Sequence, residues 1–295
     1  MAPDEVLAAE ADRQVAQHLW FNVLVVGGTD TDVLRLHRTL AHAQPLPWRP
    51  AEEVEREVVY LAVLRSGRRI ETLTLEDVLR ACEEVEERHL IDNGSIARHF
   101  RNLWNTSSAY CKHFMRGLLA LKPGDIAAGA RAGSGGLFRE GFSLTRVILP
   151  PFRVLQGSYR YAGRNWCMRN WGTPEDARLI ASRFERAGDG RRIALYELET
   201  VESAPVGVLR RLCERYSALR FGCVSVDADS GERRAHSGGG GSAFRGEALP
   251  PAPMINGGFT GSAYLETTAM ARQLVLARSA PLGSPQVPQP IRAAG

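Results

Sequence analysis

One short glycine-bounded segment, residues 157–172, combines large aromatic rings with arginines. The two kinds of side chain alternate along it, in the order Tyr159, Arg160, Tyr161, Arg164, Trp166, Arg169 and Trp171. Bases of single-stranded RNA stack on such rings, and arginine neutralises phosphates and stacks on bases in turn. The segment therefore predicts a surface that binds RNA by shape and charge rather than by base sequence. The alternative is that Trp166 and Trp171 lie in the core, with the arginines incidental.

The distribution of charge along the chain points to the same kind of partner. Residues 51–90 carry 11 acidic and 6 basic side chains, whereas residues 91–192 carry 17 basic and 7 acidic ones. A positive surplus of this size favours a polyanion over a merely solvated basic face. We add four further arginines of residues 91–192 to the predicted RNA-binding residues, namely Arg98, Arg101, Arg131 and Arg139.

Sequence motifs of catalysis and of metal binding are missing from the chain. Its seven histidines form no HExxH pattern, and there is neither a GxSxG elbow nor a phosphate-loop lysine. The five cysteines include no CxxC pair, so neither a disulfide framework nor a thiolate zinc site is indicated. We expect a protein without catalytic centre, metal or cofactor, in a reducing compartment.

A Gly27-Gly28 pair follows a short apolar strand and precedes a helix, as in dinucleotide-binding proteins. The G-x-G-x-x-G spacing is missing, however, and Asp30 and Asp32 would repel a pyrophosphate. A simple chain reversal is the preferred interpretation. A small-molecule or nucleotide-binding enzyme or regulator that uses the Gly27-Gly28 turn is kept as an alternative function.

The apolar patterning predicts an α+β fold over residues 1–229, with an acidic part to about residue 90 and a basic part after it. We expect a helix-rich single core with short mixed or antiparallel strands. The expected strands are 21–26, 144–155, 191–201 and 219–228. Two further strands, 57–64 and 70–75, are expected to form a hairpin. The expected helices are 5–19, one capped by Thr29 or Asp30, 75–88, 95–121 with a break near 105–108, 173–188 and 204–219.

The last part of the chain changes composition. Residues 230–261 are rich in Gly, Ser and Pro and are predicted to be a linker, 262–280 an amphipathic helix, and 281–295 a disordered tail. A tethered helix cannot bury its apolar face alone. Its apolar residues, which are Leu265, Met270, Leu274 and Val275, must therefore dock on the chain's own core or on another copy. Docking between copies would give self-association, head to tail. A scaffold that binds a partner through this arm helix is a further alternative.

Membrane insertion and secretion are not expected. No apolar run approaches the roughly 18–20 residues that a membrane span requires. The first residues are acidic and lack the basic and apolar regions of a secretory signal.

In length, composition and tail the chain resembles the proline-alanine-serine-rich proteins that coat the double-stranded RNA genomes of fungal polymycoviruses. It contains 36 Ala, 17 Ser and 16 Pro, has a net charge of +4 and ends in a proline-containing tail. The resemblance implies sequence-independent coating or encapsidation of a viral RNA genome, in the virion or the host cytoplasm. The expected partners are thus RNA and other copies of the chain, and the site residues come only from the basic-aromatic pattern.

Overall fold

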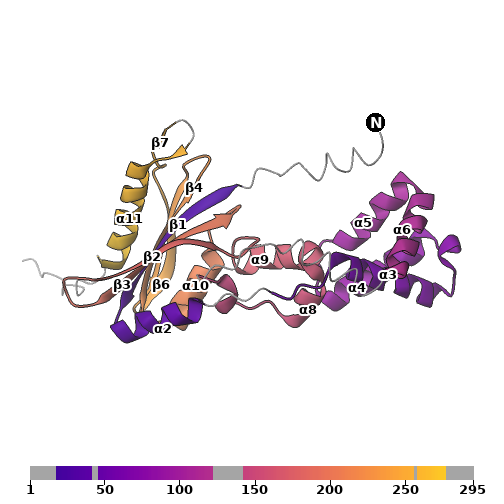
Figure 1. Ribbon diagram of the computed structural model, residues 1–295, viewed down its shortest axis with the longest axis horizontal. Helices are drawn as coiled ribbons and strands as arrows, with labels where there is room; N and C mark the ends of the chain where they lie inside the picture. The colour runs from indigo at the N-terminus through magenta and orange to yellow at the C-terminus, as the bar shows by residue number, and fades with distance from the viewer. Residues whose placement is uncertain (1–17, 42–45, 122–141, 256–257, 277–295) are drawn as a thin grey trace, which may run out of the picture.

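The computed structural model describes residues 18–41, 46–121, 142–255 and 258–276. The chain forms two lobes side by side, one built on a β-sheet and the other on helices (Figure 1). Segments α8 (Phe152–Gln156), η3 (Ser158–Gly163, a π-helical turn) and α9 (Arg164–Asn170) lie between them. Trp48 and Trp166 pack against the buried apolar clusters of both lobes and so join them.

An antiparallel sheet of six strands forms the first lobe. Its strands, in chain order, are β1 (Leu19–Gly28), β2 (Arg178–Arg186), β3 (Arg192–Val201), β4 (Arg220–Asp227), β5 (Arg233–Gly239) and β6 (Ser242–Leu249). The spatial order is β2-β3-β1-β4-β5-β6. A separate two-stranded ladder joins β7 (Met254–Ile255) to β8 (Gly258–Phe259).

Helices cover both faces of the sheet because its central strands are apolar on both sides. In β1, Leu24 and Val26 pack with α2 (Asp30–Leu40) and α10 (Val206–Arg215), whereas Val23 and Val25 pack under α11 (Gly261–Leu276). The order β2-β3-β1-β4, with α2 after β1 and α10 between β3 and β4, is a split β-α-β arrangement. The helical lobe is inserted between α2 and β2.

The helical lobe consists of four helices and one short 3₁₀ turn in the part of the chain that is described. They are α3 (Ala51–Ser66), η1 (Ile70–Thr72), α4 (Leu75–His89), α5 (Ser95–Thr106) and α6 (Ser108–Ala120). Within the described ranges, no helix is long and apolar enough to cross a membrane.

The α+β class with antiparallel strands is confirmed, together with the elements that have strong local signals. Thr29 caps α2 by accepting a hydrogen bond from the Asp32 backbone N–H, and Thr74 and Asp77 form the expected capping box of α4. The helix predicted over 95–121 does break, because Ser107 caps α6. The buried apolar side chains form two large clusters, one in each lobe.

The predicted hairpin over 57–64 and 70–75 is wrong, because the first segment belongs to α3. Its valines and its tyrosine are typical of strands. The buried residues, however, include Val54, Val58 and Leu61, whose spacing places them on one side of a helix that packs on α4 and α6. Helix α3 ends at Gly67, which adopts a left-handed conformation with φ of 65°.

The helix predicted over 173–188 is also wrong, since β2 occupies this region at the edge of the sheet. Both expected capping side chains are engaged elsewhere. The Thr173 hydroxyl donates to the Val201 carbonyl, and the Asp176 carboxylate accepts from the Leu144 N–H at 2.6 Å. The strand predicted over 144–155 is instead a 3₁₀ turn, η2 (Leu144–Arg146), followed after Pro150 and Pro151 by α8.

The predicted linker over 230–261 is contradicted by β5 and β6, which extend the sheet beyond β4. Small side chains suit β5 because α10 lies directly against it. A Cβ on Gly238 would lie 2.9 Å from the Cys213 sulfur. Glycines with positive φ at 239–241 form the turn into β6. The arm helix is α11, and the predicted tail 281–295 and most of the predicted helix 5–19 lie outside the described residues.

Candidate functional site

The predicted basic-aromatic segment does not present its rings to solvent. Tyr161 and Trp171 are 3% and 2% exposed, and the Trp171 indole N–H donates to the Ile148 carbonyl at 2.9 Å. Trp166 is half-buried with its ring edge-on to Trp171, and the half-buried Tyr159 donates its hydroxyl hydrogen to the Pro174 carbonyl. The prediction of an exposed aromatic surface is therefore wrong for Tyr161 and Trp171, and Trp171 fills the core as the alternative expected, whereas Tyr159 and Trp166 are partly buried.

The arginines of the same segment each face a carboxylate of the chain itself. Arg164 pairs with Glu202 and Arg169 with Asp92. The Arg160 guanidinium lies 3.6 Å from the carboxylate of Glu55. Each of these exposed charges thus has an acidic neighbour within the chain, which weakens the attraction of residues 157–172 for RNA.

Tyr161 belongs to a buried polar cluster that ties the connecting segment to α3. The π-helical turn directs its hydroxyl at Glu55, to which it donates a hydrogen bond, and His99 of α5 lies 3.5 Å from the same carboxylate oxygen. Burial raises the pKa of Glu55 and lowers the pKa of His99 to about 4. His99 is therefore neutral at pH 7, and the cluster holds the connecting segment against the helical lobe.

Arg98 and Arg101 are exposed on α5, as a binding surface requires, whereas Arg131 and Arg139 lie outside the described residues. Arg98 donates to the Asn93 carbonyl. Among the described residues, neither arginine has a carboxylate partner. Two of the predicted RNA-binding residues thus retain exposed, uncompensated charge.

Exposed or half-buried cations and rings lie on the neighbouring helices α5 and α6, and we refer to five of them together as the α5–α6 surface. Its members are Arg98, Arg101, Trp104, Tyr110 and Lys112. The Lys112 ammonium lies 5.4 Å from the centre of the half-buried Trp104 ring and donates to the Glu71 carbonyl, and Tyr110 is 49% exposed.

Local sequence explains why these side chains point outward. Buried apolar residues, among them Ile96, Phe100, Cys111 and Met115, turn one side of each helix into the lobe. Sequence reasoning missed Trp104, Tyr110 and Lys112. The available signal was that residues 95–120 contain no Asp or Glu. Glu71 compensates part of the charge from outside these helices, since it pairs with Arg116 at 3.0 Å.

The Gly27-Gly28 pair lies in strand β1 rather than in a turn, and both residues are buried. A Cβ on Gly27 would lie 2.6 Å from a methyl group of Val275, and one on Gly28 would lie 2.4 Å from a methyl group of Leu219. Asp30 pairs with Arg192 and Arg186. The space beside the glycines is thus filled by the chain itself, so the expected chain reversal is wrong and there is no room beside Gly27 and Gly28 for the small molecule of the alternative function.

The arm helix packs its apolar face against the sheet of the same chain. Val275 is 1% exposed and packs under the sheet with Val23 and Val224, while Met270 and Leu274 are partly buried against the same cluster. Leu265 is 68% exposed. Docking is therefore within one chain, and the prediction that this face joins copies or binds a partner is wrong for the buried residues.

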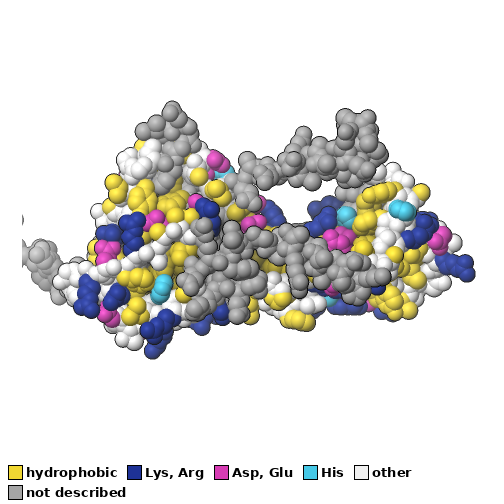
Figure 2. All heavy atoms as spheres, viewed as in Figure 1, with side chains coloured by type: hydrophobic (Ala, Val, Ile, Leu, Met, Phe, Trp, Pro, Cys, Tyr) yellow, Lys and Arg dark blue, Asp and Glu magenta, His cyan; other side chains and the backbone are white. Residues whose placement is uncertain are grey.

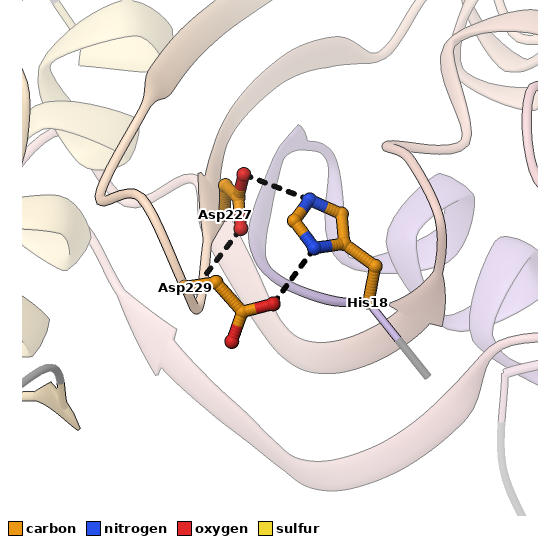
Figure 3. Close-up of side chains that lie close together, drawn as sticks. All are labelled: His18, Asp227 and Asp229. Carbon is orange, nitrogen blue, oxygen red and sulfur yellow. Dashed lines mark hydrogen bonds and ion pairs between the residues drawn. The ribbon is translucent and has the colours of Figure 1, made fainter. Parts of the chain in front are cut away.

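A histidine between two carboxylates joins the start of β1 to the end of β4 (Figure 3). The His18 Nε2 atom lies 2.9 Å from Asp227, and its Nδ1 atom lies 2.7 Å from Asp229. Asp227 also accepts from the Ser230 hydroxyl. Within the described ranges, His18, Asp227 and Asp229 form a cluster whose ligand atoms lie close enough together to hold a metal ion. Each carboxylate holds a different ring nitrogen, so the arrangement fits an imidazolium better than a metal, which would need both carboxylates beside one nitrogen.

Protein stability is expected to depend on His18 in a defined pH direction. Its hydrogen bond to Asp229, followed by the charge of Asp227, raises the pKa of His18 above 6.5. A raised pKa in the folded state means that the stabilisation is complete below pH 6.5 and is lost as pH rises through the folded pKa. The difference in free energy of unfolding between the natural chain and His18→Gln should therefore shrink from pH 6 to pH 9, as measured by urea denaturation. A constant difference would contradict the assignment, and His113→Gln, an exposed site on α6, is the control.

Comparison with known proteins gives little similarity. No protein-family model matches the chain, and no curated protein matches it. Among solved structures, the crystal structure of a protein called api92 from Yersinia pseudotuberculosis, of family DUF1281, has 10% sequence identity and a TM-score of 0.40. The match covers 81% of this chain and 100% of that one. A TM-score of 0.40 is too low for us to infer a shared fold.

Proposed function

We propose that the protein binds RNA without sequence preference through the α5–α6 surface. The observation that carries the proposal is that two adjacent helices, Ser95–Ala120, expose cations and aromatic rings and contain no carboxylate. Most other arginines of the helical lobe pair with acids, such as Arg65 with Glu84 and Arg80 with Glu76. Uncompensated cations are the groups that can exchange condensed counterions for contacts with phosphates.

The chemistry of the surface supports binding to single strands in particular. Tyr110 offers an exposed ring on which a base can stack, and a stacked base contributes about 1–3 kcal/mol. Arg98, Arg101 and Lys112 offer guanidinium and ammonium donors for the backbone phosphates. Because the proposed contacts are to phosphates and to a ring face, the expected affinity depends on charge and length rather than on base sequence.

Coating of a viral genome stays a prediction, as does self-association. Of the apolar residues of α11 that were expected to link copies, Met270, Leu274 and Val275 pack on the chain's own sheet, whereas Leu265 is exposed. Contacts between copies would have to use exposed residues, among which Leu265 is one of those predicted. The proposal is therefore restricted to RNA binding.

Salt-dependent RNA binding tests the proposal directly. In a variant with Arg98→Gln, Arg101→Gln and Lys112→Gln, affinity for unrelated single-stranded RNAs should fall to a similar degree for each RNA. The slope of log affinity against log salt should decrease by about 2, since each lost phosphate contact removes about 0.7 for a single strand. Fluorescence anisotropy at several salt concentrations measures both quantities.

A triple variant with the same change of charge provides the control. Arg65→Gln, Arg68→Gln and Arg80→Gln remove three arginines from the same lobe, each of which pairs with a carboxylate. Their loss should leave the salt slope nearly unchanged. Equal slopes for the natural chain and the α5–α6 variant would refute the proposed surface, provided that circular dichroism shows the variant to be folded.

A further inference from the structure

The sheet lobe carries a hollow of about 370 Å³ along the exposed side of α2. Helix α2 lies at the opposite end of the molecule from α5 and α6 (Figure 1). It is lined by Thr31, Arg35, Arg38 and Thr39. Basic side chains gather over α2 at the lower left of Figure 2. The hollow therefore combines positive charge with hydroxyl groups at one place.

Helical spacing brings the four lining side chains together. Thr31, Arg35 and Thr39 follow one another at intervals of four residues, and Arg38 lies three after Arg35, so all share one side of the helix. The opposite side, with Val33 and Leu36, is buried on the sheet. The Thr39 hydroxyl donates to the Arg35 carbonyl at 2.9 Å, so its hydrogen is already engaged.

The carboxylates nearest to these arginines in the sequence are already engaged. Asp30 lies 2.6 Å from Arg192 and 3.1 Å from Arg186. Asp32 accepts a hydrogen bond from the Thr29 hydroxyl at 2.7 Å. Among the described residues, no carboxylate pairs with Arg35 or Arg38, and both are exposed. Two guanidinium groups thus face the same hollow without an anion from the chain.

We propose that this hollow binds a phosphate group. Guanidinium groups hold phosphate oxygens through paired hydrogen bonds, and two of them on adjacent turns can grip one group from two sides. The Thr31 hydroxyl is a further donor for the same oxygens. The inference does not rest on the proposed RNA surface, because none of its residues is shared with α5 or α6.

Titration with inorganic phosphate and with pyrophosphate tests this site at constant ionic strength. Isothermal calorimetry and amide chemical shifts should show saturable binding to the natural chain, with the shifts of Thr31 to Thr39 moving most. The double variant Arg35→Gln, Arg38→Gln should bind pyrophosphate at least about tenfold more weakly, a loss of about 1.4 kcal/mol. Arg211→Gln, an exposed arginine of α10 that pairs with Glu214, is the matched control and should bind normally.

The same variants distinguish the sources of the phosphate. If affinity for a short RNA falls together with affinity for pyrophosphate, the site holds a nucleic-acid backbone. If only pyrophosphate binding weakens, it holds a small phosphorylated ligand. Equal pyrophosphate affinity in the natural chain and the double variant, or binding that does not saturate, would overturn the site. The α5–α6 triple variant should keep pyrophosphate binding, so failure of the RNA proposal leaves this one intact.

Discussion

Replacing Trp171 with alanine should lower the free energy of unfolding by about 4 kcal/mol, because a buried tryptophan removed from a packed core leaves a large cavity. Its ring packs with Trp166, Cys167 and Val208 in the apolar cluster on the face of the sheet that α2 and α10 cover. The indole hydrogen bond to the Ile148 carbonyl is lost as well, which leaves a partly buried acceptor without its donor. Chemical denaturation monitored by circular dichroism measures the loss.

The matched control for this variant is Phe152→Ala. Phe152 is 72% exposed at the start of α8, so its removal should change the free energy of unfolding by less than about 0.5 kcal/mol. RNA affinity of the folded Trp171→Ala protein, measured at low temperature, should equal that of the natural chain. A variant of normal stability that binds RNA more weakly would instead restore residues 157–172 as the binding surface.

Introducing a carboxylate at position 275 should destabilise the chain by more than about 3 kcal/mol, since the charge would be buried without a partner. Val275 lies against strands whose glycines allow a close approach of the helix. A Cβ on Gly222 would lie 2.7 Å from the Ala271 carbonyl oxygen. The helix thus cannot shift outward to expose an aspartate without uncovering Val23 and Val25 of the sheet. Urea denaturation of Val275→Asp tests the expectation.

Leu265→Asp provides the comparison on the same helix. Leu265 is mostly exposed, so this change should alter the free energy of unfolding by no more than about 0.5 kcal/mol. Sedimentation velocity on both variants then reports on self-association. If Val275→Asp were as stable as Leu265→Asp and dissociated an oligomer, the helix would dock between copies rather than within one chain.

Local sequence signals were sufficient to predict an element where neighbouring residues alone decide its conformation. The hydroxyl of Thr29 and the capping box of Thr74 and Asp77 satisfy backbone groups within three residues, so they could be identified from the sequence. The apolar runs of β1, β3 and β4 and the helical spacing of α10 identified these elements for the same reason.

Tertiary contacts decided the elements whose local signals are ambiguous or misleading. Thr173 and Asp176 match a capping box, but their side chains bind Val201 and Leu144 instead, and the residues after them complete an edge strand. The small residues of β5 look like a linker until α10 is placed against them.

For the candidate sites too, some features could be predicted from the sequence and others were decided by the tertiary structure. From the sequence alone one could determine that residues 91–192 are strongly basic and that Ser95–Ala120 contains no acid, because composition is a property of the chain itself. Which cations remain free depends on acids brought near by folding. Glu202 reaches Arg164 and Glu55 reaches Arg160, while Arg35, Arg38 and Arg101 meet no carboxylate within the described ranges. Charge compensation is a short-range interaction between residues far apart in sequence, so only the tertiary structure could decide it.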